Sequence, residues 1–327
     1  MRPIRRILVA VKDPTAKSLP AVMKGAQLAR AFGAHLELFH GISTPLYVDT
    51  YPYIAAVPQI ERRIRDDLIK KLETIASNLR EQGLKVSVSV TWDFPVYEAI
   101  VRRASRERAD LIVAERHAKP HIVPGLLQLT DWELLRTSPV PVLLVKNAEP
   151  YKRPAVLAAV DPLHALSKPA TLDREILSVA TSIAQALRGP LHAVHAYVPM
   201  PQEQIPHRRV SDESLKKLTQ QTEHAARRRF YRSIQSAHIP KARCHLIGRH
   251  PIDAIEATAR ATRSRIVVMG AISRSGIKRF FFGNTAEALL DSLTCDMLIV
   301  KPAEFAARVP KRIRGVRFAA TPFVPGY

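Results

Sequence analysis

The sequence repeats itself at a constant offset of 155 residues, so that residue 98 aligns with residue 253. Residues 98–115 (EAIVRRASRERADLIVAE) lie over residues 253–270 (DAIEATARATRSRIVVMG), and residues 130–146 lie over residues 285–301 without an insertion. The same offset matches His40 with His195 earlier in the chain. Because one register holds over separated blocks, the sequence indicates a tandem duplication. We therefore expect two copies of one domain.

Each copy alternates short apolar runs with helical patterns. The runs read as strands at 7–11, 35–41, 85–90, 110–114 and 140–146, and again at 156–160, 191–197, 242–247, 265–269 and 296–301. Long charged helices are expected at 60–82 and 212–238, and shorter helices near Pro95 and Pro251. This order predicts an α/β fold of two tandem doubly wound sheets, each parallel and five-stranded, with right-handed crossovers. The two copies are expected to pack as a pseudo-dimer.

The predicted boundaries follow from where the repeat begins and ends. Domain 1 spans residues 1–149, and domain 2 spans residues 153–304, after a seam rich in proline and charge. The remaining tail, residues 305–327, contains no acidic residue and five basic ones: Arg308, Lys311, Arg312, Arg314 and Arg317. Two interpretations of the tail stay open, an electrostatic arm for a phosphate backbone or membrane surface and a frayed basic terminus.

The composition limits the cellular compartment and the binding partners that are expected for this chain. The net charge is +21, which fits either a polyanionic partner such as nucleic acid or a solubilising surface, and no interleaved aromatic platform for single strands is present. Cys244 and Cys295 are the only cysteines, so a disulfide framework and a paired CxxC metal site are excluded. No apolar run is long enough for a membrane span, and the run at 7–11 is too short for a signal peptide. A cytoplasmic location is expected.

The residues at the end of domain 2 carry a family resemblance. The segment 267–302 (VVMGAISRSGIKRFFFGNTAEALLDSLTCDMLIVKP), with strands that open as ILVAV and VLAAVD, resembles the universal stress protein (UspA) superfamily. The tandem arrangement is similar to its two-domain E-type members, and the resemblance covers roughly residues 4–304. It implies a Rossmann-like fold of the adenine nucleotide alpha hydrolase type and a cytoplasmic stress-response role as a sensor or switch. It also implies ATP binding in some members and no established catalysis.

The nucleotide motif implied by the resemblance is G-x2-G-x9-G-[ST]. This sequence offers Gly270, Ser273, Gly283 and Asn284 at those positions, so the second glycine and the final hydroxyl residue have changed. Gly270 ends a strand, where a missing Cβ lets a ligand approach the backbone. The phosphate donors of such a loop are backbone N–H groups at a helix start, and Asn284 is a good N-cap, so its change need not abolish binding. Ser273 would be strained if its position requires a positive φ, unless the neighbouring Gly276 shifts the turn.

Domain 2 is therefore expected to bind ATP or a related adenine nucleotide, with Mg²⁺ accompanying it. The resemblance places the nucleotide-binding residues at Val160, Asp161, Ala196, Met269, Gly270, Ser273, Arg274, Gly276, Gly283, Asn284 and Thr285. In domain 1 the motif positions hold Glu115, Ala118, His121, Gln128 and Leu129. Because no glycine remains there and Glu115 is acidic, domain 1 should not bind a triphosphate in this way. Its edge pocket is either filled by side chains, open to an apolar ligand, or used only for pairing with domain 2.

No catalytic or metal constellation emerges from the sequence. HExxH, GxSxG and P-loop motifs are absent, and nothing pairs a nucleophile with a base, so no enzyme is expected beyond slow ATP hydrolysis. Two other functions stay open: a non-nucleotide interaction protein whose basic surface binds nucleic acid or anionic membrane, and an ATP-using enzyme by analogy of fold alone. Whether the chain forms a homodimer is also open.

Overall fold

The computed structural model describes residues 3–44, 46–47, 57–116, 130–164, 171–198, 212–271, 284–316 and 318–319. The chain divides into two compact units. The N-terminal unit comprises Arg2–Pro150 together with Ala306–Tyr327, and the C-terminal unit comprises Tyr151–Phe305. The basic tail therefore belongs with the N-terminal unit, although it follows the C-terminal unit in sequence. How the two units pack on one another stays a prediction.

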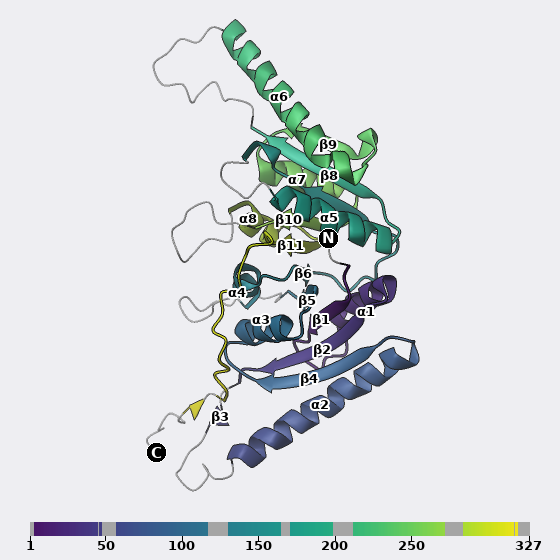
Figure 1. Cartoon of the computed structure of the whole chain (residues 1–327), viewed down its shortest axis with the longest axis vertical. Coiled ribbons are helices and arrows are strands. Elements are labelled where there is room, and N and C mark those ends of the chain that lie inside the picture. Colours follow the sequence, from purple (N-terminus) through teal and green to yellow (C-terminus); the bar gives the residue numbers. More distant parts are fainter. Residues whose placement is uncertain are drawn as a thin grey trace, which may run out of the picture. The chain divides into compact units, whose positions relative to one another are not determined.

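The N-terminal unit is a parallel sheet with helices between its strands (Figure 1). Its elements are β1 (Arg6–Ala10), α1 (Pro20–Phe32), β2 (His35–Ile42), β3 (Leu46–Tyr47), α2 (Val57–Glu81), β4 (Val86–Trp92), α3 (Val96–Arg106), β5 (Leu111–Glu115), α4 (Thr130–Thr137) and β6 (Val142–Val145). The sheet order is β4-β2-β1-β5-β6, and each neighbouring pair is parallel. The short strand β3 pairs instead with β12 (Phe318–Ala319) in the tail.

The C-terminal unit has the same architecture. Its elements are β7 (Ala155–Ala159), α5 (Leu172–Ala186), β8 (Leu191–Tyr197), α6 (Asp212–Ile234), β9 (Cys244–Gly248), α7 (Pro251–Ala261), β10 (Ser264–Gly270), α8 (Asn284–Ser292) and β11 (Asp296–Val300), with short 3-10 turns between some of them. The order β9-β8-β7-β10-β11 repeats the order of the first unit. The expected parallel, five-stranded α/β arrangement is confirmed in both copies.

The duplication is visible in the backbone as well as in the letters. The left-handed residues Gly33, Gly83 and Arg108 of the first copy recur at Arg188, His238 and Arg263, each 155 residues later. Each residue follows a helix at the point where the chain reverses toward the next strand, and a left-handed residue is a common helix stop. Three such pairs at one offset show that both copies reverse direction in the same way.

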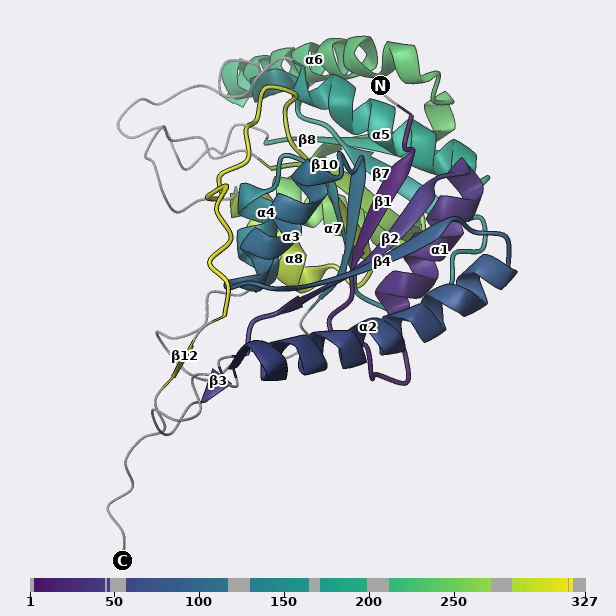
Figure 2. The ribbon, with the colours of Figure 1, turned by 60° about the horizontal axis from the view of Figure 1, so that its bottom comes forward.

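Right-handed crossovers fix which face each helix covers. In the first unit α1 lies on the opposite face of the sheet from α3, which packs against α4 (Figure 2). The central strand β5 is buried on both faces, with Leu111, Ile112 and Val113 all inaccessible to solvent. Such strands read as continuous apolar runs, which is why their positions were predictable. The structure differs from the predicted helix boundaries only locally. Helix α2 begins at Val57 rather than at residue 60. Pro95, which follows a cis peptide bond, is the N-cap of α3.

Candidate functional site

Several predicted site residues of domain 2 meet at the carboxyl edge of its sheet. The first strand, β7, lies between β8 and β10, so the chain order reverses at β7. Met269 pairs with Ala159, and this register places Gly270 beside Val160. On the other side Ala159 pairs with Val194, so the segment containing Ala196 follows at the same edge. Ligands of doubly wound sheets bind in the crevice at such a reversal point.

The phosphate half of the predicted site is only partly described. Ser273, Arg274, Gly276 and Gly283 lie outside the described residues. The helix α8 begins at Asn284, with Thr285 half-buried in its first turn. Because α8 connects β10 to the parallel strand β11 by a crossover, its N-terminus is at the carboxyl edge of the sheet. The free N–H groups of a helix start therefore lie on the side where an anion would bind.

Asp161 follows β7 and is half-buried, and a second carboxylate fixes its backbone. The Asp161 N–H donates a 3.1 Å hydrogen bond to Oδ1 of Asp173, a buried residue in the first turn of α5. Sequence reasoning did not select Asp173. The available signal was an acidic residue in the first turn of a helix, where the helix dipole favours negative charge. Two carboxylates therefore lie at this edge, where polar groups such as sugar hydroxyls are better partners than phosphates.

Gly270 has a different structural reason from the one expected. The sequence suggested that its missing Cβ allows a ligand to approach the backbone. A Cβ at Gly270 would lie 2.5 Å from Cδ2 and 2.9 Å from Cγ of Leu172, and 3.2 Å from Cδ1 of Ile176. Both side chains belong to α5, so the glycine is required for close packing of this helix on β10. The expectation of ligand approach through this Cβ direction is thus corrected.

A histidine at the same place in both copies links the first two strands of each sheet. Nδ1 of His40 lies 2.8 Å from the carbonyl oxygen of Val11, and Nδ1 of His195 lies 3.1 Å from that of Val160. Since a carbonyl oxygen only accepts, Nδ1 carries the proton in both rings. Burial lowers the pKa of His40. The aligned histidines His40 and His195 thus each connect two neighbouring strands at the carboxyl edge of their sheet.

The equivalent edge of the N-terminal unit contains an open pocket of about 260 Å³. Among its lining residues are Lys12, His40, Thr44, Glu115 and Asp131. Residues 117–129, which follow β5 at this edge, lie outside the described residues, so all three alternatives for domain 1 stay predictions. Glu115 and Asp131 place two carboxylates in the lining, and that domain 1 binds no triphosphate also stays a prediction.

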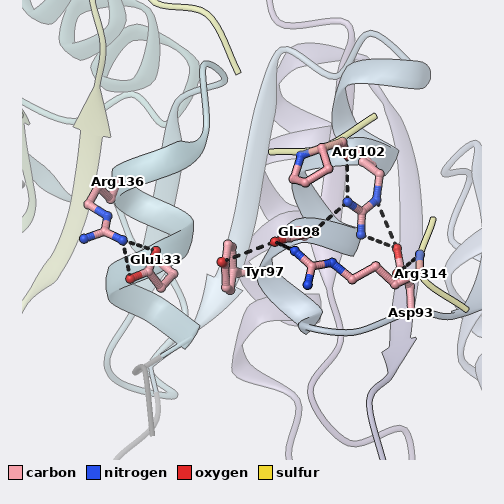
Figure 3. Close-up of polar contacts among 8 residues, drawn as sticks. Asp93, Tyr97, Glu98, Arg102, Glu133, Arg136 and Arg314 are labelled. Atoms are coloured by element: carbon pink, nitrogen blue, oxygen red, sulfur yellow. Dashed lines mark hydrogen bonds and ion pairs between the residues drawn. The ribbon is translucent and has the colours of Figure 1, made fainter. Parts of the chain in front are cut away.

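The basic tail is held on the N-terminal unit rather than extended from it. The main-chain N–H of Arg308 donates a hydrogen bond to the carbonyl of Thr137 at the end of α4. The guanidinium of Arg314 contacts Glu98 on α3. Figure 3 shows this guanidinium directed toward Glu98. Of the two interpretations of the tail, a frayed terminus is wrong for residues 306–316, and Arg314 is engaged within the chain.

Metal and membrane sites do not appear among the residues with assigned positions. Within those residues, no three His, Cys, Asp or Glu side chains group together in a way that could hold an ion. In the same part of the chain, no helix is both long and apolar enough to cross a membrane. His192 and His245 contact each other, with Nδ1 and Nε2 3.1 Å apart, as a pair on neighbouring strands.

Comparisons with known proteins agree with this fold. The family model described as "Universal stress protein family" matches residues 3–146 and again residues 155–301. The chain belongs to the universal stress protein family. It is a tandem member, similar to Universal stress protein E of Salmonella typhi and of Escherichia coli (strain K12). Each is 26% identical over 319 residues, which covers 92% of this chain and 96% of the relative.

Solved structures support the same fold. A protein of unknown function from Pseudomonas aeruginosa PAO1 superposes with a TM-score of 0.71 at 25% identity, covering 92% of this chain and 94% of that one. A universal stress protein from Archaeoglobus fulgidus DSM 4304 superposes with a TM-score of 0.57 at 15% identity, covering 92% and 99%. The second likeness supports the fold alone. Both neighbours span both domains of this universal stress protein.

Within this family framework, three features of the chain were not predicted. Asp173 fixes the backbone of Asp161, Leu172 occupies the space beside Gly270, and Arg314 contacts Glu98. Each depends on side chains meeting across a gap in the sequence, which the family motif does not encode. These three contacts are therefore found from the structure and not from the motif.

Proposed function

We propose that this protein is a cytoplasmic stress-response protein that binds ATP or a related adenine nucleotide in its C-terminal unit. The observation that carries the proposal is the register of β7 and β10, which brings Gly270 beside Val160 at the reversal point of the sheet. Family membership supports a nucleotide as the ligand class. Binding is the proposed output, as a sensor or switch, with ATP hydrolysis slow at most.

The nucleoside half of the proposed site rests on described residues. The carboxylate of Asp161 is placed to accept hydrogen bonds from ribose hydroxyls, and its backbone is held by Asp173. Backbone groups at Val160 and Ala196 would contact the base, because both lie at the edge of neighbouring strands. Charge favours this orientation, since two carboxylates attract hydroxyl donors and repel phosphate.

The phosphate half rests on the start of α8. Nine residues, Asn284–Ser292, form this helix, and its N-terminal N–H groups and dipole favour an anion. Asn284 and Thr285 would border the phosphates, and Mg²⁺ would accompany them. The predicted loop residues Ser273, Arg274, Gly276 and Gly283 complete the proposal from the sequence.

Isothermal titration of ATP into the full chain tests the proposal. We expect one nucleotide per chain, and we expect Gly283→Asp to abolish the heat, because its carboxylate would repel the phosphates. Gln128→Asp is the matched control, since residue 128 of the first copy aligns with residue 283 of the second. Equal heats from wild type and Gly283→Asp, or none from either, would contradict the proposed site.

A second titration separates the two halves of the site. Asp161→Asn should weaken both ATP and adenosine, because it removes the charge from the acceptor of the ribose hydroxyls. Gly283→Asp should weaken ATP and leave adenosine unchanged. If Asp161→Asn leaves adenosine binding unchanged, the nucleoside does not lie at this edge. Binding of nucleic acid or membrane stays a prediction from net charge alone.

A further inference from the structure

Residues 306–316 together with Phe318 and Ala319, here called the strap, lie along the N-terminal unit. The Arg308 N–H donates to the Thr137 carbonyl at 3.2 Å, and Nη1 of Arg102 donates to the Pro310 carbonyl at 2.8 Å. Further on, Phe318 and Ala319 pair in parallel with β3. In Figures 1 and 2 the strap is the yellow segment that passes α4 and α3 and reaches β12. Main-chain groups of the strap make each of these contacts.

Two buried carboxylates form the centre of this contact. Asp93 is 1% exposed and Glu98 is 4% exposed. Arg102 on α3 contacts both, at 2.5 Å from Asp93 and 3.0 Å from Glu98. Among the described residues of the body of the unit, the guanidinium of Arg102 is the one that contacts both carboxylates. Buried charges of one sign require compensation, so this surface attracts one further cation.

The strap supplies that cation. The Arg314 N–H donates to Oδ1 of Asp93 at 3.0 Å, and its Nη2 lies 2.8 Å from Oε1 of Glu98. Figure 3 shows Arg102 and Arg314 on either side of the two carboxylates. The Arg314 side chain keeps 53% of its surface exposed, whereas its partner Glu98 is buried. The two carboxylates thus belong to the body of the unit, and the arginine lies over them on the solvent side.

The strap does not fill the surface on which it lies. A pocket of about 420 Å³ remains between it and α3, bordered by Phe39, Ala99, Val309 and Ile313. Ile313 is 49% exposed, although it is a large apolar residue in the middle of the strap. A segment that is held by main-chain hydrogen bonds and by the Arg314 guanidinium, over a partly empty surface, is suited to exchange with another segment.

We propose that this surface is a binding site for an extended, arginine-bearing peptide segment of a partner protein, and that the strap occupies it as an internal competitor. Arg102 binds a peptide carbonyl. Four residues further along the peptide, Asp93 binds the main-chain N–H of the arginine and Glu98 binds its guanidinium. The strand β3 extends the site by adding a peptide strand. Charge-assisted hydrogen bonds to arginine provide the specificity.

The strap competes with a partner peptide because it is covalently attached to the same chain as the site. A segment tethered by a short linker is present at an effective concentration on the order of millimolar, so a free peptide binds weakly while the strap is seated. Weakening the strap opens the site without changing the body of the unit. The proposal therefore predicts opposite effects for one substitution, depending on whether it is placed in the chain or in the peptide.

The test uses the full chain and a labelled synthetic peptide, residues 306–319 (AARVPKRIRGVRFA), with fluorescence anisotropy. We expect Arg314→Ala in the chain to raise the affinity for this peptide by about 10-fold or more, because its strap competes poorly. Arg312→Ala is the matched control: Arg312 is exposed on the same strap, and its loss removes the same charge. This control should bind the peptide as wild type does.

Two further variants test the receptor side. The chain with Arg314→Ala is here called the opened chain. A peptide that itself carries Arg314→Ala should bind the opened chain about 10-fold or more weakly than the unchanged peptide, because one charge-assisted contact is lost. Adding Glu98→Gln to the opened chain should have the same effect, and thermal melts establish that each chain is folded. If the opened chain binds no tighter than wild type, or binds the arginine-free peptide equally well, the proposal is wrong.

Discussion

The Tyr151 hydroxyl donates a 2.6 Å hydrogen bond to Oδ2 of Asp296, 145 residues away in the sequence. Both residues belong to the C-terminal unit, Tyr151 just before its first strand and Asp296 at the start of β11. Asp296 is completely buried and Tyr151 is nearly so. A buried carboxylate without its donors is costly, so this contact ties the beginning of the unit to its last strand.

We expect Tyr151→Phe to lower the free energy of unfolding by about 1.5–3 kcal/mol, the range for a hydrogen bond to a charged group. Burial and then the Asp296 charge raise the pKa of Tyr151 well above 10.0. The stabilisation is therefore present below pH 10 and is lost as the pH rises toward the folded-state pKa. Urea unfolding at pH 8 and pH 11 checks both effects. Tyr231→Phe, on the partly exposed face of α6, should change stability by less than about 0.5 kcal/mol.

His40 is expected to titrate below its ordinary pKa of 6.5, because burial opposes its charged form. A folded-state pKa below the unfolded one means that its contribution to stability is complete above pH 6.5. This contribution is lost as the pH falls toward the folded-state pKa. NMR titration of the His40 ring, assigned with a His40→Gln variant, measures this directly. Titration at or above pH 6.5 would show that burial does not keep the ring neutral.

Gly270→Ala should destabilise the C-terminal unit by about 1–3 kcal/mol, the usual cost of overpacking, because the new Cβ overlaps Leu172. Shortening the neighbour relieves the overlap. The double variant with Leu172→Ala should therefore be more stable than the sum of the single effects, by about 1 kcal/mol or more. Thermal melts of the four chains complete the cycle. Strict additivity would show that Gly270 is not required by this helix contact.

Glu37 and Arg103 form a partly buried pair in the N-terminal unit, with Nε of Arg103 2.6 Å from Oε1 of Glu37 and Ser89 donating to the same oxygen. Arg103→Met should cost roughly 3 kcal/mol, because it leaves the carboxylate without its cation. The double variant Glu37→Met/Arg103→Met should recover most of that loss, since an apolar pair needs no compensation. Arg106→Met, an exposed arginine on the same helix, should have little effect. Equal stability of the Arg103 variant and its control would contradict the expectation.

Sequence reasoning located the strands and the repeat because both are written in local patterns. The continuous apolar runs at β5 and β10 follow from burial on both faces of each sheet. The offset of 155 residues also separates the three pairs of left-handed residues that follow helices. For the proposed nucleotide site, the sequence predicted which residues take part but not how they lie relative to one another. The register of β7 with β10 brings Val160 and Gly270 together, and it also shows that Gly270 packs against Leu172.

The sequence by itself determined the duplication, the parallel α/β architecture of each copy and the family. The architecture depends on the spacing of apolar and turn residues over a few positions. The duplication depends on one register at an offset of 155 residues, and the family on the resemblance of residues 267–302. Only the tertiary structure decided where the basic tail lies. Arg314 meets Glu98 across 216 residues, and the meeting depends on two carboxylates being buried with one arginine. Burial and long-range charge balance arise when the chain folds, so no local pattern records them.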